Sequence, residues 1–203
     1  NSMPAKTQEI ILASGNVGKI REIQAILNQH VIVPQSQFNL AEVEETGQTF
    51  IENALIKARH ATTLCQRPAI ADDSGLVVDA LEGAPGVISA RYAGEQASDA
   101  ENLAKVLQQL GNTPAAKRSA RFICVIAFLK YPDDPCPIIA EGVWEGQILF
   151  EPKGKNGFGY DPIFWVPEKN CSSAELNSAI KNSLSHRGQA LQQFQQQLKH
   201  SSA

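Results

Sequence analysis

Residues 9–27 read EIILASGNVGKIREIQAIL, and this stretch decides the fold. A short apolar run, Glu9 to Ala13, is followed by a turn that holds two glycines. Apolar side chains then recur at helical spacing, at Ile20, Ile23, Ile26 and Leu27. The stretch therefore predicts a strand, a glycine loop and a helix, which is how an α/β fold begins.

The rest of the chain continues this mixture of helices and strands. Helices are predicted at about 49–64, at 98–111 and at about 188–200, the first two from capping boxes at Thr49 and Ser98. Strands are predicted at 31–33, 69–71, 76–81 and 120–129, with a strand pair around Gly142 or Gly146 inside 138–148. No internal repeat or flexible linker separates these segments. We therefore expect a single α/β domain with a mixed twisted sheet.

The composition excludes several classes of protein. With 18 basic and 21 acidic side chains the net charge is −3, which argues against electrostatic binding of polymeric nucleic acid. At 43% apolar residues the chain has the material for a core and lacks the signature of disorder. The longest apolar run, 122–129, is far shorter than the roughly 20 residues of a membrane helix, so no membrane association is expected.

The cysteines and the chain ends indicate a setting and a domain boundary. The four cysteines are scattered without a CxxC pair, which suggests neither a zinc site nor a disulfide framework and favours a cytoplasmic location. Asn1 and Ser2 precede Met3 and are interpreted as a tag remnant. We expect residues 1–8 to be this remnant with a disordered N-terminus, and 9–199 to form one domain.

The first chemical motif is the glycine loop. Two glycines allow close approach of an anion to the backbone, and the following helix offers unpaired amides. A lysine at the end of the loop adds a charge suited to a polyphosphate. The alternative is an ordinary strand-to-helix turn with a solvated lysine, because short glycine loops are weak evidence. The residues of this motif are Ser14, Gly15, Asn16, Val17, Gly18 and Lys19.

The second motif is a pair of aspartates, Asp72 and Asp73, at the end of a predicted apolar strand. Successive strand residues point to opposite faces, so both reach one ion only if the chain turns, and Ser74-Gly75 makes a turn plausible. A divalent cation is the natural partner of buried carboxylates, and the acidic stretch ending at Glu45 offers another ligand. Turn capping by the aspartates and a solvated acidic run are the alternatives.

Two further motifs lie in the last quarter of the chain. Residues 157–162 form a loop with Phe158 and Tyr160 among glycines. One interpretation is a platform on which a base stacks, and the alternative is a structural turn with both rings packed inward. Lys181 and Ser185-His186-Arg187 gather donors suited to a carbonyl-rich ring or a phosphate, although a helix N-cap with a solvated face is the alternative.

In order and context these segments closely resemble the non-canonical purine nucleoside triphosphate pyrophosphatases, the inosine triphosphate pyrophosphatase family. The resemblance runs from Ile10 to about Leu191 and includes Gly83-Ala84-Pro85-Gly86 and Ser89-Ala90-Arg91-Tyr92. It implies an elongated α/β protein with a mixed sheet flanked by helices, two lobes, a central active-site cleft and a homodimeric assembly. It also implies hydrolysis of ITP, dITP and XTP to the monophosphate and pyrophosphate with Mg²⁺.

The resemblance assigns a role to each motif. Ser14 to Lys19 would hold the triphosphate, Glu45 and Asp73 would ligate the metal, Asp73 would act as the base, and Ser74 would contact substrate. The residues Phe158, Gly159, Tyr160 and Asp161 would enclose the purine. The residues Lys181, His186 and Arg187 would read the base edge. On the chemistry alone Asp72 is the reserve for the base.

Two other functions are compatible with these motifs. A pyrophosphatase for modified pyrimidines or other altered nucleotides would share the metal and phosphate machinery but not the base reading. A nucleotide-binding regulator without catalysis is the other, and the presence of Asp73 and Lys19 argues against it.

Overall fold

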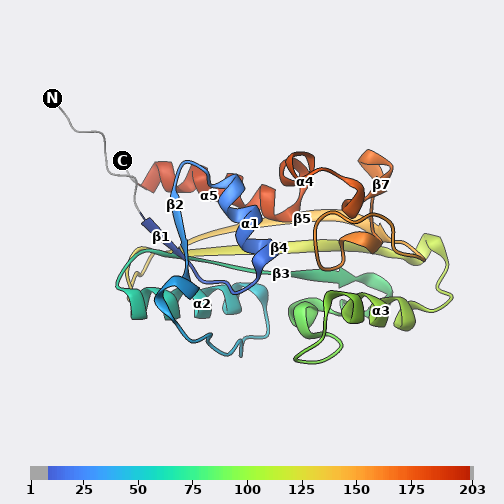
Figure 1. Ribbon diagram of the computed structural model, residues 1–203, viewed down its shortest axis with the longest axis horizontal. Coiled ribbons are helices and arrows are strands. Elements are labelled where there is room, and N and C mark those ends of the chain that lie inside the picture. Colours follow the sequence, from blue (N-terminus) through green and yellow to red (C-terminus); the bar gives the residue numbers. More distant parts are fainter. Residues whose placement is uncertain (1–8, 202–203) are drawn as a thin grey trace. The chain divides into compact units, whose positions relative to one another are not determined.

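The computed structural model describes residues 9–201 (Figure 1). The tag remnant and disordered N-terminus expected for residues 1–8 lie outside the described residues. None of the helices within 9–201 has the length and apolarity needed to cross a membrane.

Within the described residues, seven strands form one mixed sheet in the order β2-β1-β3-β4-β5-β6-β7. Strand β1 pairs in parallel with both β2 and β3, whereas β5, β6 and β7 pair antiparallel. The predicted α/β class with a mixed sheet is confirmed. The strands are β1 (Glu9–Leu12), β2 (Val31–Pro34), β3 (Ala69–Val78), β4 (Ser119–Leu129), β5 (Ile138–Ile148), β6 (Phe164–Val166) and β7 (Cys171–Ser172).

The helices begin where the sequence places capping side chains. Asn16, Thr49 and Ser98 each accept a hydrogen bond from the backbone N–H three residues ahead, which satisfies an otherwise unpaired amide. The short helix α4 is capped by Asn177 in the same way and was not predicted. The helices are α1 (Val17–Ile26), α2 (Phe50–Cys65), α3 (Asp99–Leu110), α4 (Ser178–Leu184) and α5 (His186–Ser201).

Two expectations about strands are wrong. The predicted turn at Ser74-Gly75 is absent, because both residues lie inside β3, which runs unbroken from Ala69 to Val78. The predicted strand pair within 138–148 is the single strand β5. Gly146 does not break β5; a Cβ there would overlap the carbonyl of Trp165 and the ring of Phe164, so the glycine permits close packing of the neighbouring strand.

The chain forms two compact units. Of the described residues, unit 1 contains 9–73, 125–140 and 190–201. Unit 2 contains Ser74–Cys124 and Glu141–Gln189. Each of four elements has residues in both units, namely strands β3, β4 and β5 and helix α5.

The core of unit 1 is built from aliphatic strands and a helix with small side chains. In β1 the residues Ile11 and Leu12 are fully buried. Helix α2 presents alanines at 54, 58 and 61, all fully buried, and this narrow face lets the helix lie close to β1. Phe128 packs edge to face against Phe194 of α5, with ring centroids 5.3 Å apart.

The core of unit 2 is aromatic. Phe122 lies at its centre, with ring centroids 4.4 Å from Phe164 and 6.2 Å from Trp144. Helix α3 closes this core with its periodic apolar face, namely Leu103, Val106 and Leu110. The cluster therefore holds together the helix and strands that carry the loops of unit 2.

Asp79 at the end of β3 generates a prediction about stability. Its carboxylate accepts hydrogen bonds from Ser119 Oγ at 2.6 Å and from both terminal nitrogens of Arg121 at 2.9 Å, and these bonds lower its pKa to about 2. Since the site is exposed, Asp79→Asn should cost at most about 1 kcal/mol at pH 7. A depressed carboxyl pKa stabilises the fold above the unfolded value near 4 and loses that effect as the pH falls through about 2. Urea unfolding of both proteins should therefore show a difference at pH 7 that shrinks towards pH 2.5, and a constant difference would contradict this account.

Candidate functional site

The glycine loop leaves β1 and enters α1 with its backbone open to solvent. Gly15, Asn16 and Val17 are exposed, and they lie at the N-terminus of a helix of ten residues. The Ser14 hydroxyl accepts from the Asn16 N–H at 3.2 Å, which holds the loop in shape. The exposed residues 15–17 lie at the positive end of the helix, where an anion is favoured.

Lys19 and Asp72 form an ion pair beside this loop. Lys19 Nζ lies 2.8 Å from Asp72 Oδ1, and the Asp72 side chain is fully buried. A buried carboxylate is strongly destabilising without a cation, so Lys19 compensates the charge of Asp72. The pair fixes the ammonium of Lys19 at the loop that it follows in sequence.

Asp73 faces a different lysine. Lys57 Nζ on α2 lies 2.8 Å from Glu45 Oε1 and 3.6 Å from Asp73 Oδ1, and it donates to the backbone carbonyl of Asp72 at 2.6 Å. Because β3 does not turn, the side chains of Asp72 and Asp73 point to opposite faces of the strand. The hypothesis that a turn lets both aspartates reach one ion is therefore wrong. Glu45 is the second carboxylate that contacts Lys57 together with Asp73.

The second carboxylate oxygen of Asp73 is buried and unsatisfied. Among the residues that the structure describes, none hydrogen-bonds to Asp73 Oδ2. Burial is the main cause that raises the pKa of Asp73 to about 6, with the neighbouring Glu45 and Asp72 adding to the rise and Lys57 and Lys19 opposing it. Burial therefore makes the Asp73 carboxyl group a weaker acid than an exposed aspartate.

Lys57 is a residue that the sequence motifs missed. Burial disfavours its ammonium, but the attraction of Asp73 and Glu45 outweighs that effect and the pKa of Lys57 is raised. Position 57 lies between Ala54 and Ala61 on the buried side of α2, and a lysine within an alanine face was the signal that could have identified it. A charge on a buried face requires a partner, which here is the acidic cluster.

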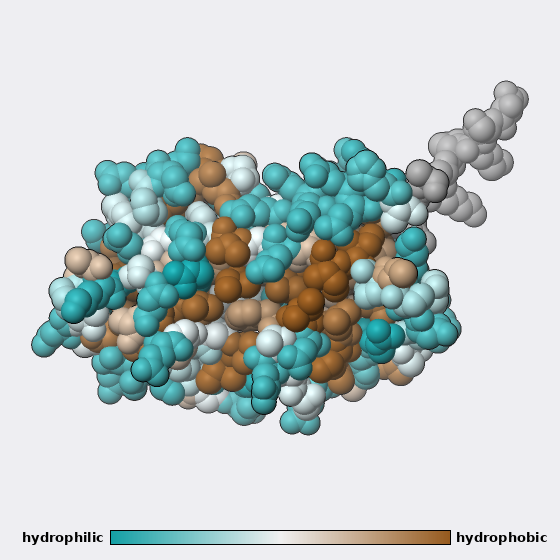
Figure 2. All heavy atoms as spheres, turned by 180° about the vertical axis from the view of Figure 1, so that it is seen from behind, coloured by the Kyte–Doolittle hydropathy of each residue, from teal (hydrophilic) through white to brown (hydrophobic). Residues whose placement is uncertain are grey.

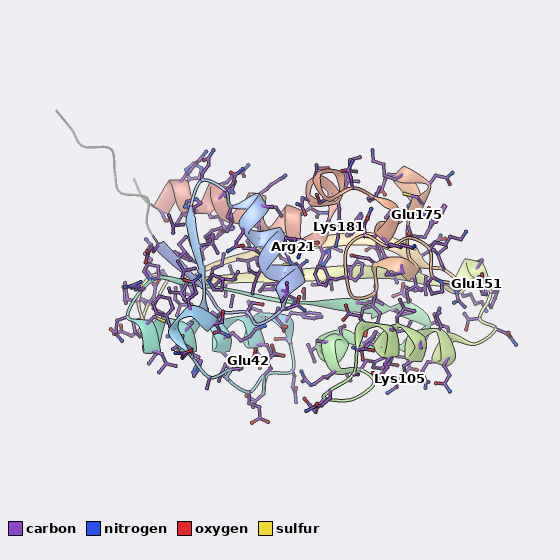
Figure 3. The ribbon with its side chains drawn as sticks, viewed as in Figure 1. Arg21, Glu42, Lys105, Glu151, Glu175 and Lys181 are labelled. Carbon is purple, nitrogen blue, oxygen red and sulfur yellow. The ribbon has the colours of Figure 1, made fainter. Side chains whose placement is uncertain are left out.

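Unit 2 holds a second group of the predicted site residues. Phe158 lies with its ring centroid 4.8 Å from Lys181 Nζ and 5.6 Å from the guanidinium carbon of Arg187. Lys181, marked on Figure 3, is almost buried and forms an ion pair of 2.6 Å with Asp161 Oδ2. The structure therefore brings together Phe158, Asp161, Lys181 and Arg187, which are separated by up to 29 positions in sequence.

The remaining predicted residues of unit 2 have packing partners of their own. Arg187 donates to Ser74 Oγ at 2.8 Å, and its side chain is buried. His186 stacks on Phe122 with centroids 4.7 Å apart and rings 14° from parallel, so the imidazole is a member of the aromatic core. The hydroxyl of Tyr160 donates to the carbonyl of Ser89 at 2.6 Å, and burial raises the pKa of this phenol.

Metal-binding groups are sparse. Within residues 9–201, no three or more His, Cys, Asp or Glu side chains gather in an arrangement that could hold a metal ion. The acidic cluster of unit 1 offers two carboxylates, Glu45 and Asp73, on either side of Lys57.

Comparison with known proteins gives the family. The model of the Ham1 family matches residues 10–197, almost the whole chain. The chain belongs to the Ham1 family. A relative from Vibrio cholerae named dITP/XTP pyrophosphatase is 58% identical over 189 residues, covering 92% of this chain and 94% of the relative. A relative of the same name from Coxiella burnetii is 54% identical over 188 residues, with 92% and 94% covered.

Solved structures of the Ham1 family agree with the fold. A HAM1 protein from Coxiella burnetii has a TM-score of 0.87 at 53% identity and covers 95% of this chain and 99% of that one. The Ham1 protein from Staphylococcus aureus has a TM-score of 0.84 at 42% identity, with 96% and 100% covered. The resemblance to nucleotide pyrophosphatases stated from the motifs is confirmed.

The buried carboxylate of Asp73 leads to a prediction about stability. Because its pKa is raised above the unfolded value, ionised Asp73 destabilises the folded state at pH values above about 6. We expect Asp73→Asn to stabilise the metal-free protein by about 1 to 3 kcal/mol, which chemical denaturation at pH 7.5 in EDTA measures. A variant less stable than the wild type would contradict this prediction. It would show that the attraction between Asp73 and Lys57 stabilises the fold by more than the burial of the Asp73 charge destabilises it.

Proposed function

We propose that this protein hydrolyses dITP, ITP and XTP to the nucleoside monophosphate and pyrophosphate. Membership of the Ham1 family and close relatives named dITP/XTP pyrophosphatase support the proposal. The observation that carries it is the buried Asp73 carboxyl group, with one oxygen unsatisfied and a pKa near neutrality, beside Glu45 and Lys57. Removing these nucleotides would keep deaminated purines out of the nucleotide pool.

The residues of unit 1 suit Mg²⁺ as the cofactor. Mg²⁺ prefers oxygen ligands and is commonly held by one or two carboxylates, with the other positions taken by water and substrate phosphates. Glu45 and the unsatisfied oxygen of Asp73 match that donor set, so we assign them as the ligands. When bound, the ion supplies positive charge that offsets the charge of the phosphates.

Within unit 1 we assign roles to two lysines and two aspartates. The loop 14–19 and the ammonium of Lys19 bind the triphosphate, and Asp72 holds Lys19 in place through its ion pair. Asp73 accepts the proton of the attacking water, since a carboxylate positioned beside the bound water can act as a general base. Lys57 restrains Asp73 and Glu45. Release of pyrophosphate in one step requires attack at the α-phosphorus.

Within unit 2 we assign base recognition to Phe158, Lys181 and Arg187. A purine stacks on an aromatic ring such as that of the half-buried Phe158, and the 6-oxo group of hypoxanthine or xanthine accepts hydrogen bonds from cationic donors. Adenine carries an amino group at that position and would leave those donors unpaired, which disfavours it strongly. Asp161 orients Lys181 through the buried ion pair. Tyr160 and His186 contribute through packing.

The resemblance to the inosine triphosphate pyrophosphatase family also supports a proposal about assembly and location in the cell. We propose a cytoplasmic homodimer that binds neither polymeric nucleic acid nor a membrane. Figure 2 shows a contiguous hydrophobic area right of centre on one face, which is the kind of surface that a second copy covers. Sedimentation at micromolar concentration should give twice the mass of one chain, and a monomer mass would contradict the dimer.

A substrate panel tests the reaction. With ITP, XTP, ATP, GTP and dTTP, and with phosphate and pyrophosphate assayed separately, we expect pyrophosphate from ITP and XTP at much higher kcat/KM than from ATP. Orthophosphate as the primary product, or equal rates on ATP and ITP, would refute the proposal. Preference for a modified pyrimidine nucleotide would favour the alternative function, a pyrophosphatase that acts on modified pyrimidines or other altered nucleotides.

The assignment of the base is tested by paired amide variants. Asp73→Asn should lower kcat on ITP by about 100-fold or more, because it removes a proton acceptor and a charged ligand. The matched variant Asp72→Asn alters the residue that pairs with Lys19 and should retain more of kcat while raising KM. If Asp73→Asn keeps normal turnover, the base is Asp72 or Glu45.

A further inference from the structure

The loop that carries Phe158 is held by hydrogen bonds within the loop and by contacts from other elements. Phe158 stands between Gly157 and Gly159, which have φ of +71° and +62°, in the left-handed region that glycine adopts without strain. Within the loop, the N–H of Phe158 donates to Asp161 Oδ2 at 3.0 Å and the N–H of Asp161 donates to the carbonyl of Phe158 at 3.2 Å. The backbone that follows Phe158 is restrained by contacts from other elements.

One of these contacts comes from the first residue of α3. Asp99 Oδ2 accepts a hydrogen bond of 2.9 Å from the N–H of Gly159, sixty positions later in the sequence. A carboxylate acceptor makes such a bond stronger than a neutral acceptor would. Because Gly159 adjoins Phe158, this bond fixes the backbone immediately after the ring.

Asp99 is itself held rigidly. The capping box of α3 joins Ser98 and Glu101 through two reciprocal hydrogen bonds, 3.0 and 3.1 Å long, on either side of Asp99. The helix is anchored by Val106, which is fully buried in the core of unit 2. The carboxylate of Asp99 is thus presented from a fixed backbone position.

The same side of α3 restrains the loop by a second route. Asn102 donates to the carbonyl of Ala90 and accepts from the N–H of Ala93, and Lys105, marked on Figure 3, donates to the carbonyl of Tyr92. These bonds fix the segment 89–93, whose Ser89 carbonyl accepts from the hydroxyl of Tyr160. Residues 99, 102 and 105 are spaced by three and lie on one side of the helix.

We propose that Asp99 is a positioning residue for purine binding, which sets the place of Phe158 through the N–H of Gly159 without touching the substrate. The inference rests on the function proposed above, in which Phe158 stacks on the base. Asp161 restrains the loop from its other side, since its Oδ2 accepts from the N–H of Phe158 at 3.0 Å and its Oδ1 from Ser173 Oγ at 3.0 Å. Asp99 is the contact that can be removed without disturbing the buried Lys181–Asp161 pair.

Steady-state kinetics on ITP test this role. Asp99→Ala should raise KM by about 3- to 10-fold with kcat within about twofold, because a hydrogen bond to a charged group is lost and the loop must be ordered on binding. Asp99→Asn keeps an oxygen acceptor and should recover most of the affinity. If Asp99→Ala folds poorly, Asp99→Ser replaces it in the experiment, because serine shortens the side chain while keeping a polar residue at the helix start. We expect Asp99→Ser to raise KM by the same amount, about 3- to 10-fold.

The control variant is Glu101→Ala. It weakens the same helix start by removing half of the capping box but leaves the Asp99 carboxylate in place. We expect its KM to stay within about twofold of the wild type. An equal rise of KM in Glu101→Ala and Asp99→Ala would reduce Asp99 to a residue that merely stabilises α3 and would overturn the proposal.

Amide hydrogen exchange gives a readout that does not depend on activity. The N–H of Gly159 should exchange faster in Asp99→Ala than in wild type or Glu101→Ala, because only that variant removes its acceptor. Unchanged exchange, or faster exchange with an unchanged KM, would refute the positioning role. A wild-type protein that leaves ITP intact would instead refute the proposed function, whatever the exchange result.

Discussion

A β-strand cannot direct two consecutive side chains to one face, and β3 carries aspartates at two consecutive positions, 72 and 73. Each carboxylate is buried and must find its own cation on its own side of the strand. Lys19 from the start of α1 serves Asp72, and Lys57 from the middle of α2 serves Asp73. The two lysines that neutralise these carboxylates therefore require both helices to lie close to β3.

The two ion pairs are not equivalent. Asp72 lies 2.8 Å from its lysine, whereas Asp73 shares its lysine with Glu45 at the longer distance of 3.6 Å and keeps one oxygen unsatisfied. The closer pair orients a lysine at the glycine loop, and the looser one leaves a carboxylate with capacity to bind a cation or a proton. In unit 2 the buried pair of Lys181 and Asp161 is of the close kind, which agrees with the role in base recognition proposed for Lys181.

Local patterns predicted the parts of the fold whose causes are local. The capping side chains of Thr49 and Ser98 identified their helices, because a cap and its amide lie within three residues. The turn at Ser74-Gly75 was predicted wrongly because Gly75 has turn character only in isolation; in the fold it lies inside the ten-residue strand β3. Lys57 was missed because its partners, Glu45 and Asp73, lie 12 and 16 positions away and meet it only after α2 packs. The contact between Asp99 and Gly159 depends in the same way on tertiary packing that no motif records.

The unsatisfied oxygen of Asp73 also has a meaning for how this sequence is maintained. A neutral amide at position 73 would remove a buried charge, and selection for folding stability alone would favour it. Proteins accept such a cost where a destabilised group does chemical work. On the role proposed for Asp73, the acid at this position records selection for activity over stability.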